Sequence, residues 1–126
     1  MLMTMAEKME LRRKAKFLED MGYTVSENEY GLDYNTDQIK FDLGYERYEE
    51  GAAAVMRFKK MNESFDVGWI AVVRENLDLK HIDRKKSLYL FVAFIKENYD
   101  KLMDVRYCRE SIAMVRSYLE RKWAEK

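Results

Sequence analysis

Hydrophobic residues recur along the first twenty positions at the spacing of an α-helix. Thr4 and Glu7 fit a capping box, in which each side chain accepts a hydrogen bond from the backbone N–H of the other residue. Gly22 is a natural C-terminal stop. The pattern predicts a helix from Thr4 to Gly22. One stripe of this helix is apolar and contains Leu11, Ala15, Leu18 and Met21.

The hydrophobic period changes to two in the middle of the chain, which indicates β-strands. Clean alternation predicts half-buried strands over residues 39–46 and 54–59, and shorter strands over 23–26 and 30–34. Residues 64–74 are apolar on both faces, which is typical of a central strand. Turn-forming residues separate the segments at positions 35–37, 49–51 and 61–63. Connections this short predict an antiparallel meander.

The last third of the chain has helical periodicity. Asp83 is expected to cap a helix that runs to about Met103, and a final helix starts at about Asp104. The first of these helices has the wider apolar face and should be the most buried. Its face comprises Leu88, Phe91, Val92, Ile95, Tyr99 and Leu102, widened by Leu90, Ala93 and Phe94. The final helix has a narrower stripe of Val105, Cys108, Ile112, Val115, Leu119 and Trp123.

These elements predict a fold in which helices and strands are segregated. The chain contains no proline, no repeat and no linker, so residues 1–126 are expected to form a single α+β domain. We expect an antiparallel meander sheet of three to five strands. One N-terminal and two C-terminal helices should pack on one face of that sheet.

Composition and charge narrow the classes of protein. With 48% hydrophobic and 37% charged residues, the 126-residue chain is typical of a globular domain, not a disordered or membrane-spanning chain. Lys and Arg total 23, as do Asp and Glu, so no net charge draws the chain to nucleic acid or an anionic membrane. The charge is nevertheless uneven. Residues 27–50 contain eight acids and two bases, whereas the flanking segments are net basic.

Several chemistries have little support. One Cys and one His are too few for an internal disulfide or a usual zinc site, and no Gly-rich phosphate loop occurs, so no cofactor is expected. His81 is interpreted as an ordinary loop residue. Cys108 lies between Arg106 and Arg109 near a helix start, where a thiol pKa is lowered. Its position on the buried stripe nevertheless favours a structural role. The absence of a secretory signal and the lone Cys suggest the cytoplasm.

Two further kinds of site were weighed. A carboxylate-bound metal site would need Asp33, Asp37, Asp42 and Glu46 to converge, but Asp42 and Glu46 lie roughly 13 Å apart along one strand. Metal ligation is therefore not predicted. Nucleic-acid binding would use the basic clusters at residues 12–16 and 84–86. Nearby acids offset both clusters, so solvated helix faces are the preferred interpretation.

Aromatic and acidic residues interleave over Tyr45–Glu50, at the end of a predicted strand and its turn. The pattern fits either a solvated hairpin or a recognition surface for a basic protein. Complementary charge would speed the encounter and select the partner, while Tyr supplies anchoring area. The predicted contact residues are Asp42, Glu46, Glu49 and Glu50, with Tyr48 and Tyr34 as anchors.

Short stretches of the chain resemble small bacterial immunity proteins found beside secreted polymorphic toxins. These stretches are Ile39-Lys-Phe, Tyr45-Glu-Arg-Tyr-Glu49, Gly68-Trp-Ile-Ala71 with Arg74-Glu-Asn, Lys96-Glu-Asn-Tyr99 and Tyr107-Cys-Arg-Glu-Ser111. The resemblance spans about residues 39–111. It implies a single-domain cytoplasmic protein, often α+β, that binds and blocks a cognate toxin. Such proteins share no common binding motif, so the resemblance assigns no contact residue.

Three functional hypotheses follow. The first is a non-catalytic inhibitor of the immunity type, whose acidic surface blocks a basic toxin or effector. The second is a homodimeric structural or regulatory module. Leu2, Met5 and Met9, which face away from the main stripe of the first helix, would contribute to the dimer contact. The third is an enzyme with a carboxylate-bound metal.

Overall fold

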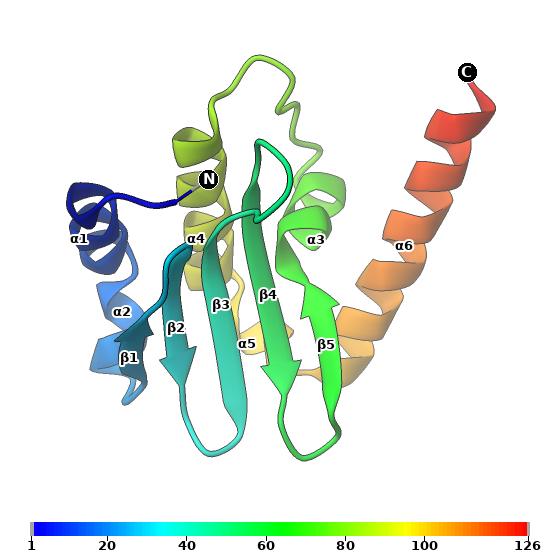
Figure 1. Ribbon diagram of the computed structural model, residues 1–126. Coiled ribbons are helices and arrows are strands. Elements are labelled where there is room, and N and C mark those ends of the chain that lie inside the picture. The colour runs from blue at the N-terminus through cyan, green and yellow to red at the C-terminus, as the bar shows by residue number, and fades with distance from the viewer. Residues whose placement is uncertain (1, 126) are drawn as a thin grey trace.

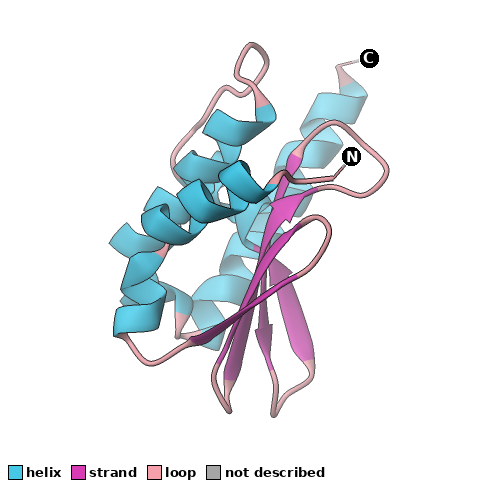
Figure 2. Ribbon diagram, turned by 60° about the vertical axis from the view of Figure 1, so that its left-hand side comes forward, coloured by secondary structure: helices cyan, strands magenta, loops and turns pink. Residues whose placement is uncertain are grey.

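The computed structural model describes residues 2–125 and has an α+β fold. Five antiparallel strands form a sheet in the order β1-β2-β3-β4-β5, so the predicted meander is confirmed. Figure 1 shows α4 behind the sheet and α1 to the left of the strands, and Figure 2 shows that the helices gather on one side of the sheet. The strands are β1 (Thr24–Glu27), β2 (Gly31–Asn35), β3 (Ile39–Tyr45), β4 (Ala52–Phe58) and β5 (Glu63–Asp66). The helices are α1 (Met5–Lys14), α2 (Lys16–Asp20), α3 (Val67–Arg74), α4 (Arg84–Glu97), α5 (Tyr99–Leu102) and α6 (Val105–Ala124).

The central strands place their apolar residues on the face that the helices cover. Phe41 in β3 lies opposite Tyr34 in β2 and Met56 in β4, and all three side chains are fully buried. Each large side chain buried in this way contributes about 1.5–3 kcal/mol to folding. The alternation along β3 therefore leaves its other side chains, such as Asp42, on the uncovered face.

The N-terminal helix begins as predicted. The Glu7 N–H donates to Thr4 Oγ1 at 3.1 Å, and the Thr4 N–H donates to Glu7 Oε1 at 3.0 Å, which completes the capping box. The helix is interrupted at Ala15 and resumes as α2. Gly22 then adopts a φ of +104°, a left-handed conformation that glycine accommodates readily. Of the predicted stripe, Met21 is exposed and the other three residues are buried.

The prediction of one central strand over residues 64–74 is wrong. Strand β5 ends at Asp66 and lies at the edge of the sheet, and helix α3 follows directly. The Asp66 carboxylate caps this helix by accepting from the Trp69 N–H at 3.1 Å. Residues 67–73 carry no polar side chain because α3 buries one face of this stretch, with Val67, Ile70 and Ala71 at helical spacing.

The C-terminal helices begin at their predicted caps, Asp83 and Asp104. The expected helix to Met103 is divided at Asn98 into α4 and the short α5. Leu90 and Ala93 are exposed, so they do not widen the buried face as predicted. Trp123 is 75% exposed, because the last turns of α6 extend past the core (Figure 1).

Candidate protein-binding surface

Five of the six predicted contact residues gather at and beside the β3–β4 connection, residues 46–51. The Glu46 N–H donates to the Gly51 carbonyl at 2.9 Å and closes this connection. Glu49 and Glu50 are exposed, and the Tyr48 side chain is 95% exposed. The connection therefore presents acidic groups and an aromatic ring together at one end of the sheet.

Asp42 lies on the uncovered face of the sheet, directly opposite Asp33 in β2. The pKa of Asp42 is raised to about 6. Burial is the largest cause, and the neighbouring Asp33 carboxyl is the next. Lys40 Nζ lies 3.4 Å from Asp42 and partly opposes this effect. Like charges directly opposite each other destabilise a strand pair.

A hollow of about 540 Å³ covers this part of the uncovered face, and Asp42, Glu46 and Tyr48 all line it. Its floor is formed where Gly31 and Gly44 pair across β2 and β3. A Cβ on Gly44 would lie 2.3 Å from the Tyr30 carbonyl oxygen, so only glycine fits there. We call this hollow the sheet-face hollow.

Tyr34 is not part of this surface. Its side chain is 0% exposed and lies on the helix-covered face, where its hydroxyl is buried without a hydrogen-bond partner among the described residues. Strand alternation is the reason: Tyr34 and Asp33 are adjacent, so their side chains lie on opposite faces. The prediction that Tyr34 anchors a partner is therefore wrong.

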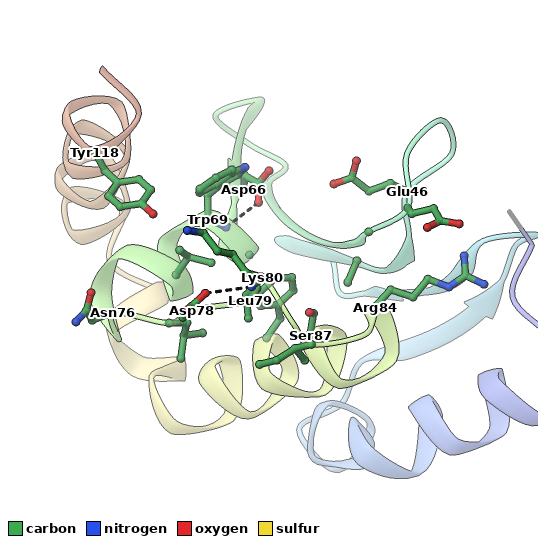
Figure 3. Close-up of a pocket in the computed structure, with 18 of the residues that line it drawn as sticks. Glu46, Asp66, Trp69, Asn76, Asp78, Leu79, Lys80, Arg84, Ser87 and Tyr118 are labelled. Atoms are coloured by element: carbon green, nitrogen blue, oxygen red, sulfur yellow. Dashed lines mark hydrogen bonds between the residues drawn. The ribbon is translucent and has the colours of Figure 1, made fainter. Parts of the chain in front are cut away.

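A second concave surface lies on the other side of the β3–β4 connection. It is a cavity of about 610 Å³ bounded by α3, the α3–α4 connection, the start of α4 and the α6 residue Tyr118 (Figure 3). Phe91, Val72 and Leu79 contribute apolar wall. The charged residues of the lining are of both signs: Glu46, Glu50, Asp66, Asp78, Lys80, Arg84 and Lys122. We call it the α3 cavity.

Carboxylates and aromatic rings both line the α3 cavity. Burial raises the pKa of Glu46, and the charges of Glu49 and Asp66 raise it further. Burial also raises the pKa of Asp66, although backbone N–H groups of Trp69 and Gly68 oppose this effect. The rings of Trp69 and Tyr118 lie 6.2 Å apart, centroid to centroid. The cavity thus combines destabilised negative charge with aromatic surface.

Sequence reasoning missed Asp66, Trp69 and Tyr118. The predicted strand over residues 64–74 would place Asp66 and the Trp69 ring on opposite faces of the sheet. An Asp immediately before an apolar run is an N-cap signal, and eleven residues exceed the usual strand length. These two signals would have indicated α3.

Leu2, Met5 and Met9 form an exposed apolar cluster at the N-terminus. Their exposed fractions are 61%, 60% and 67%, whereas Leu11 on the other side of α1 is fully buried. The predicted orientation, away from the main stripe, is confirmed. Their predicted role in self-association stays a prediction.

The remaining candidate residues have unremarkable surroundings. His81 is exposed in the α3–α4 connection. Cys108 is fully buried, its Sγ donates to the Leu102 carbonyl at 3.2 Å, and burial raises its pKa to about 12, so its thiol is protonated. Within residues 2–125, no three His, Cys, Asp or Glu side chains are grouped so that they could hold a metal ion.

The basic clusters are partly engaged with other side chains. Arg12 forms an ion pair with Glu19 at 2.8 Å, and the Lys14 ammonium lies 5.1 Å from the centre of the Tyr89 ring. Arg84 stacks over Tyr45 at 3.8 Å. No helix in the part of the chain that the structure describes has the length and apolar character to cross a membrane.

Comparison with known proteins identifies no relative. No family model, no curated protein and no solved structure matches the chain.

Proposed function

We propose that this protein is a non-catalytic protein-binding domain of the immunity type, which inhibits a basic toxin or effector. The observation that carries the proposal is the β3–β4 connection, where Glu46, Glu49, Glu50 and the exposed Tyr48 lie between two concave surfaces. Among residues 2–125, no Lys or Arg nitrogen lies within 4 Å of these three carboxylates. Their charge is therefore available to a partner.

The physical basis is charge complementarity around an aromatic anchor. An acidic patch increases the rate of encounter with a basic protein and disfavours acidic competitors. Tyr48 offers a large side chain that loses little conformational freedom when a partner buries it. An inhibitor needs only to cover its target, which is consistent with a site built from surface groups.

Charge reversal tests the proposal. The tagged protein is used to capture a partner from the lysate of its host, and the captured protein is identified by mass spectrometry. We expect a basic protein that is released by salt, that arrests growth when expressed alone, and that is tolerated when this chain is expressed with it. The double variant Glu46→Lys, Glu49→Lys should lose both capture and protection while remaining folded.

The matched control carries the same change in net charge at the other end of the sheet. Asp37→Lys with Glu97→Lys alters two exposed carboxylates away from the β3–β4 connection. This control should retain the partner and protect growth. Equal loss in both double variants, or retention in both, would contradict the assigned surface.

A homodimeric module is the second candidate, and the exposed cluster of Leu2, Met5 and Met9 favours it. A second copy would bury these side chains. Full burial of each would contribute up to about 1.5–3 kcal/mol to the free energy of association. Light scattering at micromolar concentration tests the idea directly. A dimer mass that becomes a monomer mass in Met5→Lys, Met9→Lys would support it, and a monomeric wild type would exclude it.

A further inference from the structure

The α3 cavity is lined by both carboxylates and aromatic rings. Figure 3 shows Asp66 beside Trp69 at the start of α3, with Glu46 on one side of this pair and Tyr118 of α6 on the other. Carboxylates pair strongly with guanidinium and ammonium groups, and aromatic faces attract the same cations. The cavity volume of about 610 Å³ is within the range of sites that enclose a small ligand.

We propose that the α3 cavity binds one arginine side chain of the basic partner. Glu46 and Asp66 pair with its guanidinium group, and the Trp69 ring packs against its aliphatic stem. Arginine suits the site better than lysine, because its planar fork of N–H donors can engage two separate carboxylates. This inference rests on the proposed function, since it names the residue type that the acidic surface recognises.

Lys80, Arg84 and Lys122 also line the cavity, but none of them forms an ion pair with Glu46 or Asp66. Among residues 2–125, no Lys or Arg nitrogen lies within 4 Å of Glu46 or Asp66. The Arg84 guanidinium stacks over Tyr45 and acts on the nearby Glu7, whose pKa is lowered mainly by its hydrogen bond with Tyr45. A bound guanidinium would therefore neutralise charge that is otherwise unpaired.

A buried serine provides an independent indication of a ligand. Ser87 in α4 is only 6% exposed, lines the cavity and points its hydroxyl into it (Figure 3). This hydroxyl makes no side-chain hydrogen bond to the described residues, whereas the buried Ser111 hydroxyl bonds to the Tyr107 carbonyl at 2.7 Å. A serine oxygen that is free to accept gives a guanidinium N–H a further partner.

A glycine keeps the floor of the cavity open. A Cβ on Gly68 would lie 3.0 Å from Phe91 Cε2 and 3.3 Å from Asp66 Oδ1. Any side chain at this position would press on both the apolar wall and the capping carboxylate. Gly68 thus lets the Asp66 carboxylate border the cavity while α3 packs closely on α4.

Trp69 can report binding. The chain has two tryptophans, so Trp123→Phe leaves Trp69 as the only one. This variant is titrated with the peptide acetyl-Gly-Arg-Gly-amide and, separately, with the same peptide containing citrulline, which has nearly the shape of arginine but no charge. We expect a saturable change in Trp69 emission with the arginine peptide. Binding of the citrulline peptide should be about tenfold weaker, because a charge-assisted hydrogen bond is lost.

Two glutamine variants locate the binding. Glu46→Gln keeps the side-chain volume but removes the charge. This variant should bind the arginine peptide about tenfold more weakly than the parent does. Glu29→Gln alters an exposed carboxylate outside the cavity and should bind as the parent does. Unchanged Trp69 emission together with unchanged amide shifts at Gly68 and Ser87 would overturn the inference. Equal binding of both peptides, or equal binding by Glu46→Gln, would also overturn it.

The two proposals can fail separately. If the arginine peptide does not bind while salt-sensitive capture of a basic protein persists, the cavity assignment is wrong and the inhibitor proposal stands. If the peptide binds as expected but no basic partner is captured, the inhibitor proposal is wrong.

Discussion

The sheet-face hollow and the α3 cavity share Glu46 but differ in how their charges are balanced. In the sheet-face hollow, Lys40 lies 3.4 Å from Asp42, and Arg47 lies over the Tyr30 ring at 5.0 Å. In the α3 cavity, the carboxylates have no such cation within 4 Å among the described residues. The acidic segment thus has a direct ion pair in one hollow, whereas in the other Lys80, Arg84 and Lys122 line the cavity without pairing with Glu46 or Asp66. Local pairing, not the count of acids, distinguishes the two.

The largest effect should come from the floor of the sheet-face hollow. In Gly44→Ala, the new Cβ would lie 2.3 Å from the Tyr30 carbonyl oxygen, a backbone atom that cannot move without disturbing β2. We expect a loss of about 2–3 kcal/mol in the free energy of unfolding, measured with urea. At the edge of the α3 cavity, Gly51→Ala meets only Glu46 side-chain atoms at 3.7 Å or more and should cost little. Similar losses in both variants would remove this difference between the surfaces.

An intermediate effect should come from Asp66, which both caps α3 and borders the α3 cavity. Asp66→Ala removes the acceptor of the Trp69 N–H and should lower the free energy of unfolding by about 1 kcal/mol. Asp66→Asn retains a capping oxygen, so the free energy of unfolding of this variant should change little. The affinity of the variant for the arginine peptide should nevertheless fall. Urea unfolding and Trp69 emission measure the two roles separately. An asparagine variant that binds as well as the parent would limit Asp66 to capping.

The smallest effect should come from Asp42, and it depends on pH. The pKa is raised from 3.8 to about 6 in the folded protein, so protonated Asp42 stabilises the fold below about 3.8, and this contribution is lost as the pH rises through 6. Asp42→Asn should therefore stabilise the protein near neutral pH and not below about pH 4. Its side chain is 45% exposed, so solvent screening limits the gain to roughly 0.2–1 kcal/mol.

Thermal unfolding at the two pH values measures this gain. Asp37→Asn, in the exposed β2–β3 turn, serves as the control and should show no such dependence. A gain of the same size at both pH values would contradict the assignment of the effect to Asp42 ionisation.

Local patterns predict most of the fold. The alternation over Ile39–Tyr45 follows from a sheet with one covered face, and the caps at Thr4, Asp83 and Asp104 follow from short side chains placed before apolar helical stripes. Residues 64–74 could not be assigned by apolar content alone, because an edge strand followed by a buried helix has the same continuous apolar pattern as a central strand.

The site was only partly predictable for a different reason. The acidic character of Glu46–Glu50 is evident in the charge distribution. The partners of these residues in the α3 cavity, however, come from elements more than fifteen positions away, and no local period relates them. Tyr34 illustrates the same limit, since its alternation pattern does not indicate which face of the sheet the helices cover.

Amide hydrogen exchange of the captured complex tests the central claim most directly. We expect partner binding to slow exchange over residues 46–51 and 66–80 and to leave the N-terminal segment at residues 2–9 unchanged. Protection confined to residues 2–9, with none at the β3–β4 connection, would contradict the acidic recognition surface and support the self-associating module.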